Sequence, residues 1–84
     1  MLYIMIRADC PYCAEAKKNL KKIMEETPEY QDLPIGWLEE EDEERDHYYI
    51  PAYFWDKEKL GEGEYREEVM RALLEKAYRL FKEQ

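Results

Sequence analysis

The segment Cys10-Pro11-Tyr12-Cys13 contains the only two cysteines of the chain, and the rest of the predicted fold is arranged around it. The residues before it, Leu2–Ile6, are all apolar or aromatic, which is the pattern of a strand that is buried on both faces of a sheet. After it, apolar residues recur at helical spacing as far as Met24. The two cysteines therefore stand where a buried strand passes into a helix.

The spacing of the two cysteines predicts a redox-active pair. Residues three apart on the first turn of a helix are neighbours, so Cys10 and Cys13 can close a disulfide with little backbone movement. Pro11 suits the first helical position because it has no N–H to leave unpaired there. Cys10 then falls at the N-cap, where free backbone N–H groups and the positive end of the helix dipole stabilise a thiolate. We expect Cys10 to be an exposed attacking thiol and Cys13 to be a sheltered resolving thiol.

Two other uses of such a cysteine pair stay open. A zinc site needs about four ligands, and the chain has no second cysteine pair. Its only histidine is His47, which we expect to be solvated or hydrogen-bonded. Acidic residues or a second subunit would have to complete the ligand set. A structural disulfide across so short a loop would restrict the unfolded chain very little. The redox interpretation is therefore favoured over both.

The composition is that of a small, acidic, folded domain. The chain has 84 residues, of which 45% are hydrophobic and 40% are charged, and its formal net charge is −8. This charge argues against binding to nucleic acid or to an anionic membrane surface. No apolar run has the length of a membrane span, and the first residues lack the features of a secretory signal. We therefore expect one monomeric domain over residues 1–84 in the cytoplasm, where a disulfide cycles rather than persists.

The rest of the chain predicts an α/β domain. A strand, a helix and a second strand in this order imply a parallel strand pair with a right-handed crossover. The acidic run Glu39–Asp46 holds one basic residue in eight, and a solvated loop or short exposed helix is favoured over a docking surface. The first helix is predicted to end before Pro28, and a loop is predicted over Tyr30–Pro34. Strands are predicted over Ile35–Leu38 and Ala52–Trp55, and a fourth strand begins at Lys59-Leu60 and is broken at Gly61 and Gly63. A closing helix from Tyr65 is predicted to pack on the sheet.

With Cys-Pro-Tyr-Cys on the first strand–helix turn and Ile50-Pro51 opening a later strand, the chain resembles the glutaredoxin branch of the thioredoxin superfamily. The resemblance covers nearly the whole chain in element order, length and motif position. It implies a thioredoxin-like, three-layer α/β/α domain with a mixed four-stranded sheet in the order β-α-β-(α)-β-β-α. The motif itself is typical of the dithiol glutaredoxins.

The resemblance also implies roles for residues around the cysteines. In this family the proline that opens the third strand is cis and faces the active cysteines, and Pro51 is similar in placement. The backbone of Ile50 would then pair with a bound peptide or with glutathione as a short added strand. Arg7, three residues before Cys10, would contact a substrate carboxylate and favour the thiolate. Tyr12 would lie on the rim of the groove.

The sequence departs from the family pattern on the glutathione side of the expected site. Tyr49 stands where the family commonly has a threonine, and Glu62 replaces the second of two adjacent glycines. Glu64 keeps the register of the acidic residue that holds the glutathione amine. Glu62 and Asp9, by contrast, would repel a glutathione carboxylate. We therefore expect the dithiol chemistry to carry over better than the glutathione site.

The expected activity is that of a small thiol–disulfide oxidoreductase. The Cys10 thiolate attacks a protein disulfide or a glutathione mixed disulfide, and Cys13 then attacks Cys10 and releases the reduced product. Glutathione or a thioredoxin-reductase-like flavoenzyme would reduce the pair again, and no cofactor is expected to be tightly bound. Two alternatives stay open: a non-catalytic binding module that keeps the groove, and the handling of zinc or an iron–sulfur cluster by the two cysteines across a dimer.

Overall fold

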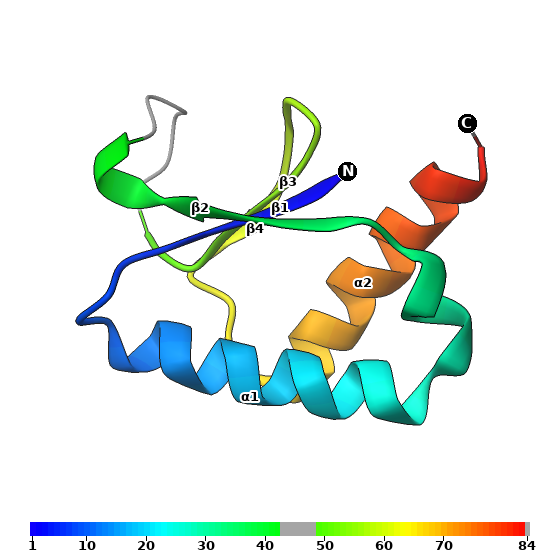
Figure 1. Ribbon diagram of the computed structural model, residues 1–84, viewed down its shortest axis with the longest axis horizontal. Coiled ribbons are helices and arrows are strands. Elements are labelled where there is room, and N and C mark those ends of the chain that lie inside the picture. Colours follow the sequence, from blue (N-terminus) through cyan, green and yellow to red (C-terminus); the bar gives the residue numbers. More distant parts are fainter. Residues whose placement is uncertain (43–48, 84) are drawn as a thin grey trace.

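The computed structural model describes residues 1–42 and 49–83, which form a mixed four-stranded sheet and two α-helices (Figure 1). The strands are β1 (Leu2–Ile6), β2 (Ile35–Glu39), β3 (Ala52–Trp55) and β4 (Glu58–Glu62). The helices are α1 (Pro11–Glu26) and α2 (Glu67–Lys82), with the 3₁₀ turns η1 (Pro28–Asp32) after α1 and η2 (Glu40–Asp42) after β2. The α/β class and the predicted order of strands and main helices are confirmed.

β1 and β3 are the interior strands of the sheet, whose order is β2-β1-β3-β4. β2 is parallel to β1, as the strand–helix–strand pattern predicted, and β3 is antiparallel to β1. β4 returns antiparallel to β3 as a hairpin, with an irregularity of register between Tyr53 and Phe54. An interior strand is covered on both faces, which explains why β3 is buried throughout and why four of the five residues of β1 are buried.

The main hydrophobic core lies between the sheet and the two helices. Successive side chains of a strand point to opposite faces, so alternate residues of β1 and β3 point into this core. Each helix adds buried residues three or four positions apart, which is the spacing of one helix face. The buried residues are Leu2, Ile4 and Ile6 of β1, Tyr53 and Trp55 of β3, Cys13, Ala16, Leu20 and Ile23 of α1, and Met70, Leu74 and Ala77 of α2, together with Cys10 and Leu33 outside these elements.

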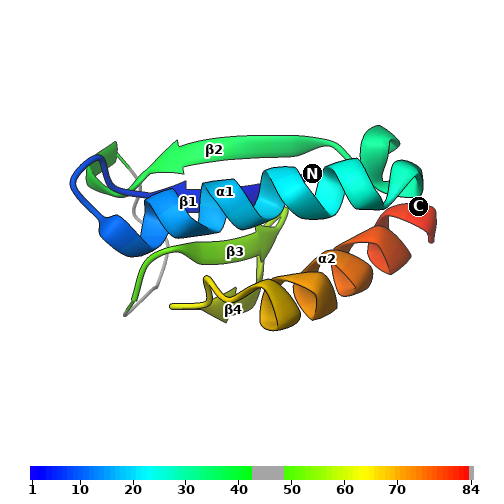
Figure 2. The same cartoon turned by 90° about the horizontal axis from the view of Figure 1, so that it is seen from below.

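Both α-helices lie on the same face of the sheet, so the described residues form two layers rather than the expected three (Figures 1 and 2). The expected element order included an optional helix in the chain segment that joins β2 to β3. The described part of this segment contains only the three-residue turn η2, which is too short to cover a sheet face. The rest of the acidic run, together with His47, lies outside the described residues. The opposite face carries a smaller apolar cluster of Met5, Ala52 and Phe54, with Tyr3 and Leu38 packed against it.

Several predicted boundaries differ from those observed. The segment Tyr30–Pro34, predicted as a loop, is partly a 3₁₀ turn, and β2 extends one residue further, to Glu39. β4 begins at Glu58 and continues through Gly61 instead of breaking there, because Gly61 pairs with Tyr53 of β3. α2 begins at Glu67 rather than at Tyr65. None of the helices in the described residues combines the length and the apolar character needed to cross a bilayer.

The packing of α1 on the sheet can be tested at Ile23, which has no exposed surface. Replacing Ile23 with alanine leaves a cavity between α1 and the rest of the core, so we expect the free energy of unfolding to fall by about 2–5 kcal/mol. Urea denaturation of the reduced protein measures the change. The matched control is Lys21→Ala at an exposed position of the same helix, where the change should stay within about 0.5 kcal/mol. Equal losses in the two variants would contradict the packing.

Candidate active site

The pairing of β1 with β3 brings two distant parts of the sequence to the same edge of the sheet. β1 runs toward this edge and continues into the turn before α1, while the antiparallel β3 begins at the edge. In the observed register Met5 lies opposite Ala52. Pro51, just before Ala52, therefore lies at the edge where the chain leads on to Cys10.

Cys10 is the N-cap residue of α1, as its sequence position predicted. Its backbone is extended, and its Sγ accepts a hydrogen bond from the Cys13 N–H, with a sulfur–nitrogen distance of 3.2 Å. Pro11 fills the first turn, where its missing N–H leaves no bond unmade. The Cys10 carbonyl accepts a hydrogen bond from the Ala14 N–H and so begins the helix. The Cys10 sulfur thus has a backbone donor at the positive end of the helix dipole.

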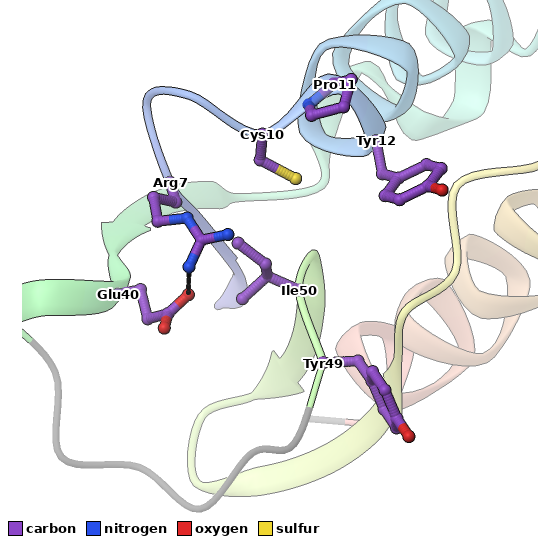
Figure 3. Close-up of a pocket in the computed structure, with 7 residues that line it drawn as sticks. All are labelled: Arg7, Cys10, Pro11, Tyr12, Glu40, Tyr49 and Ile50. Atoms are coloured by element: carbon purple, nitrogen blue, oxygen red, sulfur yellow. Dashed lines mark ion pairs between the residues drawn. The ribbon is translucent and has the colours of Figure 1, made fainter.

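Cys10 is more buried than the sequence predicted. Only 7% of its surface is exposed, against 2% for Cys13, so the expectation of an exposed Cys10 is wrong while the predicted order of burial is confirmed. The cause is tertiary, because both cysteines belong to the core cluster against which Ile50 packs. The Cys10 sulfur nevertheless faces a pocket in the surface (Figure 3).

Cys13 is the first residue of the buried stripe of α1, and both cysteines are free thiols. Burial raises the pKa of the Cys13 thiol from 9.0 to about 11, and its hydrogen bond with the Cys10 side chain acts in the same direction. Cys13 therefore keeps its proton at neutral pH. A thiol that keeps its proton is a poor nucleophile, so this environment makes Cys13 unsuited to attack first.

The pocket has a volume of about 280 Å³ and lies where β1, β2 and β3 meet the start of α1 (Figure 3). It brings together several residues that the resemblance assigned to the site, and it adds two that were not predicted there, Glu40 and Tyr49. The predicted parallel pairing of β1 with β2 could have placed Glu40 at the site. The residues that follow two neighbouring parallel strands lie at the same end of the sheet, so Glu40 after β2 lies near Arg7 after β1. The described residues that line the pocket are Arg7, Cys10, Pro11, Tyr12, Glu40, Tyr49 and Ile50.

The Ile50-Pro51 peptide bond is cis, as the resemblance implied. Pro51 is fully buried, and its carbonyl accepts a hydrogen bond of 2.8 Å from the Gly63 N–H. Gly63 has a φ of +71°, a conformation that glycine adopts at little cost. Ile50 is half-buried in the pocket wall, and no hydrogen bond within the described residues uses its backbone. The backbone N–H and C=O groups of Ile50 can therefore pair with an added extended chain.

Arg7 is paired with two acidic side chains of the protein itself. Its Nε lies 3.0 Å from Asp9 Oδ1. Its Nη1 lies 3.9 Å from Glu40 Oε2, and Figure 3 shows this second pair. Among the described residues that line the pocket, Arg7 alone carries a positive charge. The guanidinium that the resemblance assigns to a substrate carboxylate is thus already shared between two carboxylates.

Glu64 does not line the pocket, although the resemblance assigned it to substrate binding. Its backbone carbonyl accepts a hydrogen bond of 2.6 Å from the Tyr53 hydroxyl. Glu62 contacts the pocket wall instead: its carboxylate accepts a hydrogen bond from the Tyr49 N–H at 3.3 Å and pairs with Lys59 at 3.1 Å. The acidic side chain beside this wall is therefore the one that departs from the family pattern.

Tyr12 lies on the rim of the pocket, where the resemblance placed it. Its side chain is half-exposed, and its ring packs on Tyr65, with ring centroids 4.8 Å apart. Tyr65 lies in the segment between β4 and α2, so this segment supports the outer wall beside Cys10. The rim therefore offers an aromatic surface next to the Cys10 sulfur (Figure 3).

The raised pKa of Cys13 makes stability depend on pH above neutrality. The unfolded chain loses this proton near pH 9.0, whereas the folded protein holds it up to about pH 11. We therefore expect the free energy of unfolding of the reduced protein to fall as pH rises through this interval, by at most about 3 kcal/mol. Urea denaturation at a series of pH values measures the effect.

Cys13→Ser is the comparison for this prediction, because serine does not titrate in this range. The decrease above pH 9 should be smaller in this variant. Burial also raises the pKa of the Tyr53 hydroxyl, which adds a separate decrease at high pH that Tyr53→Phe removes. The same pH dependence in Cys13→Ser and in the wild type would refute the effect.

Comparison with known proteins supplies no family for this chain. No family model, no curated protein and no solved structure matches it. Its function is therefore inferred from the geometry of the site and from the resemblance of its motif.

Proposed function

We propose that the protein is a thioredoxin-like, glutaredoxin-related thiol–disulfide oxidoreductase in which Cys10 is the nucleophile and Cys13 is the resolving thiol. The observation that carries this proposal is the place of the Cys10 sulfur. It caps α1, accepts the Cys13 N–H at 3.2 Å, and faces a pocket whose wall includes Ile50, next to the cis-proline. A sulfur in this place meets a substrate disulfide on one side and has its resolving partner on the other.

The reaction proceeds in two exchanges. The Cys10 thiolate attacks one sulfur of the substrate disulfide, the substrate S–S bond breaks, and the first product leaves as a thiolate that takes up a proton. Cys13 then loses its proton and attacks the Cys10 sulfur, which breaks the mixed disulfide and releases the second product thiol. Two electrons pass to the substrate, and the protein is left with a Cys10–Cys13 disulfide. Glutathione or a flavoenzyme of the thioredoxin-reductase type would return the electrons.

The different burial of the two cysteines supports this division of roles. Because its pKa is raised to about 11, Cys13 remains a thiol at neutral pH and does not compete for the substrate. Its proton needs to leave only in the second exchange, when the departing product thiolate can accept it. The order of attack is thus set by the environment of the second sulfur.

The architecture supports the thioredoxin-like part of the proposal. β1, α1 and β2 form a unit with parallel strands, and β3 and β4 form an antiparallel hairpin before the closing helix α2. The cis-proline immediately precedes β3. This is the element order that the resemblance implies, with both long helices on the face that contains Cys13.

The low exposure of Cys10 favours a second candidate function, a binding module without turnover. With only 7% of its surface exposed, Cys10 could line a peptide groove without reacting. A metal-handling role has less support, because no group of three or more His, Cys, Asp or Glu side chains gathers as a metal site in the described part of the chain. The cysteine variants below separate turnover from simple binding.

Cys10→Ser and Cys13→Ser should have different consequences. In Cys10→Ser we expect the rate of reduction of a peptide disulfide to fall at least about a hundredfold, because the nucleophile is gone. In Cys13→Ser the first exchange should proceed, so a mixed disulfide between Cys10 and the peptide should accumulate. Quantitative mass spectrometry after acid quenching measures both outcomes.

Ala14→Ser is the control for these variants, since it adds a hydroxyl at an exposed position of the same helix. Its rate should stay within about twofold of the wild type. Disulfide reduction that persists in Cys10→Ser would overturn the assigned nucleophile. Peptide binding without any exchange in the wild-type protein would establish the binding module instead.

A further inference from the structure

We infer that the pocket selects polypeptide disulfides whose cysteine is flanked by basic residues, and that it discriminates against anionic thiols such as glutathione. This inference rests on the proposed function and names the substrate class of the same site. It follows from three observations: the charge around Arg7, the fixed position of Glu40, and the apolar remainder of the lining.

Among the described residues, the charged side chains that gather around Arg7 beside the Cys10 pocket have a negative sum. Arg7 supplies one positive charge, and its partners Asp9 and Glu40 supply two negative charges at 3.0 and 3.9 Å. A substrate carboxylate that approached Arg7 would be the third carboxylate around one guanidinium. It would be attracted by the Arg7 guanidinium and repelled by the Asp9 and Glu40 carboxylates.

The position of Glu40 is set by the sheet. Glu40 follows β2 directly, and the last residue of β2, Glu39, lies opposite Ile6 at the end of β1. The residues after the two strands, Glu40 and Arg7, are therefore held together at the pocket. The Glu40 side chain is 29% exposed, so its charge is screened less by solvent than that of Asp9, which is 84% exposed.

The rest of the lining suits a polypeptide rather than a small charged thiol. Apart from Arg7, Glu40 and Cys10, the lining residues within the described part of the chain are a proline, two tyrosines and an isoleucine. A bound polypeptide can bury apolar surface against these side chains. The backbone of Ile50 makes no hydrogen bond within the described residues and can pair with that of the polypeptide. An extended chain that crosses Cys10 would carry its neighbouring side chains toward the Arg7–Asp9–Glu40 cluster. Lysine or arginine at those neighbouring positions complements the cluster.

The whole chain adds to this preference at long range. Its formal net charge of −8 raises the local concentration of basic peptides and lowers that of acidic ones. This contribution depends on total charge and not on where the charge lies. A local contribution from Glu40 can therefore be separated from it by removing the same charge elsewhere.

The test uses capped five-residue peptides as symmetric disulfides, whose central cysteine is flanked by two lysines, two glutamines or two glutamates. Fully reduced protein is mixed with each peptide, and formation of the Cys10–Cys13 disulfide is followed in a single turnover. The rate of each peptide with dithiothreitol alone corrects for its intrinsic reactivity. We expect the lysine peptide to react about tenfold faster than the glutamate peptide at low salt, and less than about threefold faster at high salt.

Two matched variants separate the local from the global charge. Glu40→Gln should lower the lysine-to-glutamate rate ratio at least about threefold, and should speed the reaction of oxidised glutathione, because Arg7 loses one partner. Glu75→Gln makes the same change of total charge by breaking an exposed pair with Arg79 on α2, and it should leave the ratio unchanged. Asp9→Asn should also lower the lysine-to-glutamate rate ratio. Because the Asp9 side chain is 84% exposed, this variant tests the inference even if Glu40→Gln folds poorly.

The outcomes distinguish this inference from the proposed function. A lysine preference that weakens in Glu40→Gln or Asp9→Asn, but not in Glu75→Gln, establishes the inference. Equal corrected rates for the three peptides, or a ratio that Glu75→Gln lowers as much as Glu40→Gln, overturn it and leave the oxidoreductase standing. Absence of exchange with every peptide overturns the proposed function and, with it, this inference.

Discussion

The antiparallel pairing of β1 with β3 is the constraint on which the rest of this molecule depends. With Met5 opposite Ala52, the end of β1 and the start of β3 lie at one edge, so the turn that carries Cys10 meets the cis-proline segment. A slip of one residue would move every side chain of β3 to the other face of the sheet. Tyr53 and Trp55 would leave the main core, and Ile50 would leave the pocket wall.

Cys13 belongs both to the packing of the core and to the candidate site. Cys13 is the first buried position of α1, in line with Ala16, Leu20 and Ile23, and it is also the thiol that lies beside Cys10. The packing that holds α1 to the sheet removes water from the Cys13 sulfur and raises its pKa to about 11. The raised pKa of Cys13 is thus chiefly a consequence of how the helix is anchored.

The surroundings of the pocket differ from those of a site built for an anionic thiol. Two carboxylates share the only positive charge among the described lining residues, and Glu62 lies beside the Tyr49 wall. Glu64, whose register matched the glutathione site, does not line the pocket. The cysteine pair at the start of α1 is therefore as the resemblance predicted, while the charges around it are the basis of the proposed preference for basic peptides.

The order of the strands and long helices and the N-cap position of Cys10 could be predicted from the sequence, although several boundaries could not. These predictions follow from local patterns: apolar runs for β1 and β3, helical spacing in α1 and α2, and a proline in the first turn. Three features depend on tertiary contacts: both helices cover one face of the sheet, Cys10 is buried, and Glu40 pairs with Arg7. These features depend on which residues face each other across the sheet, and strand register joins segments too distant in the chain for local patterns to relate them.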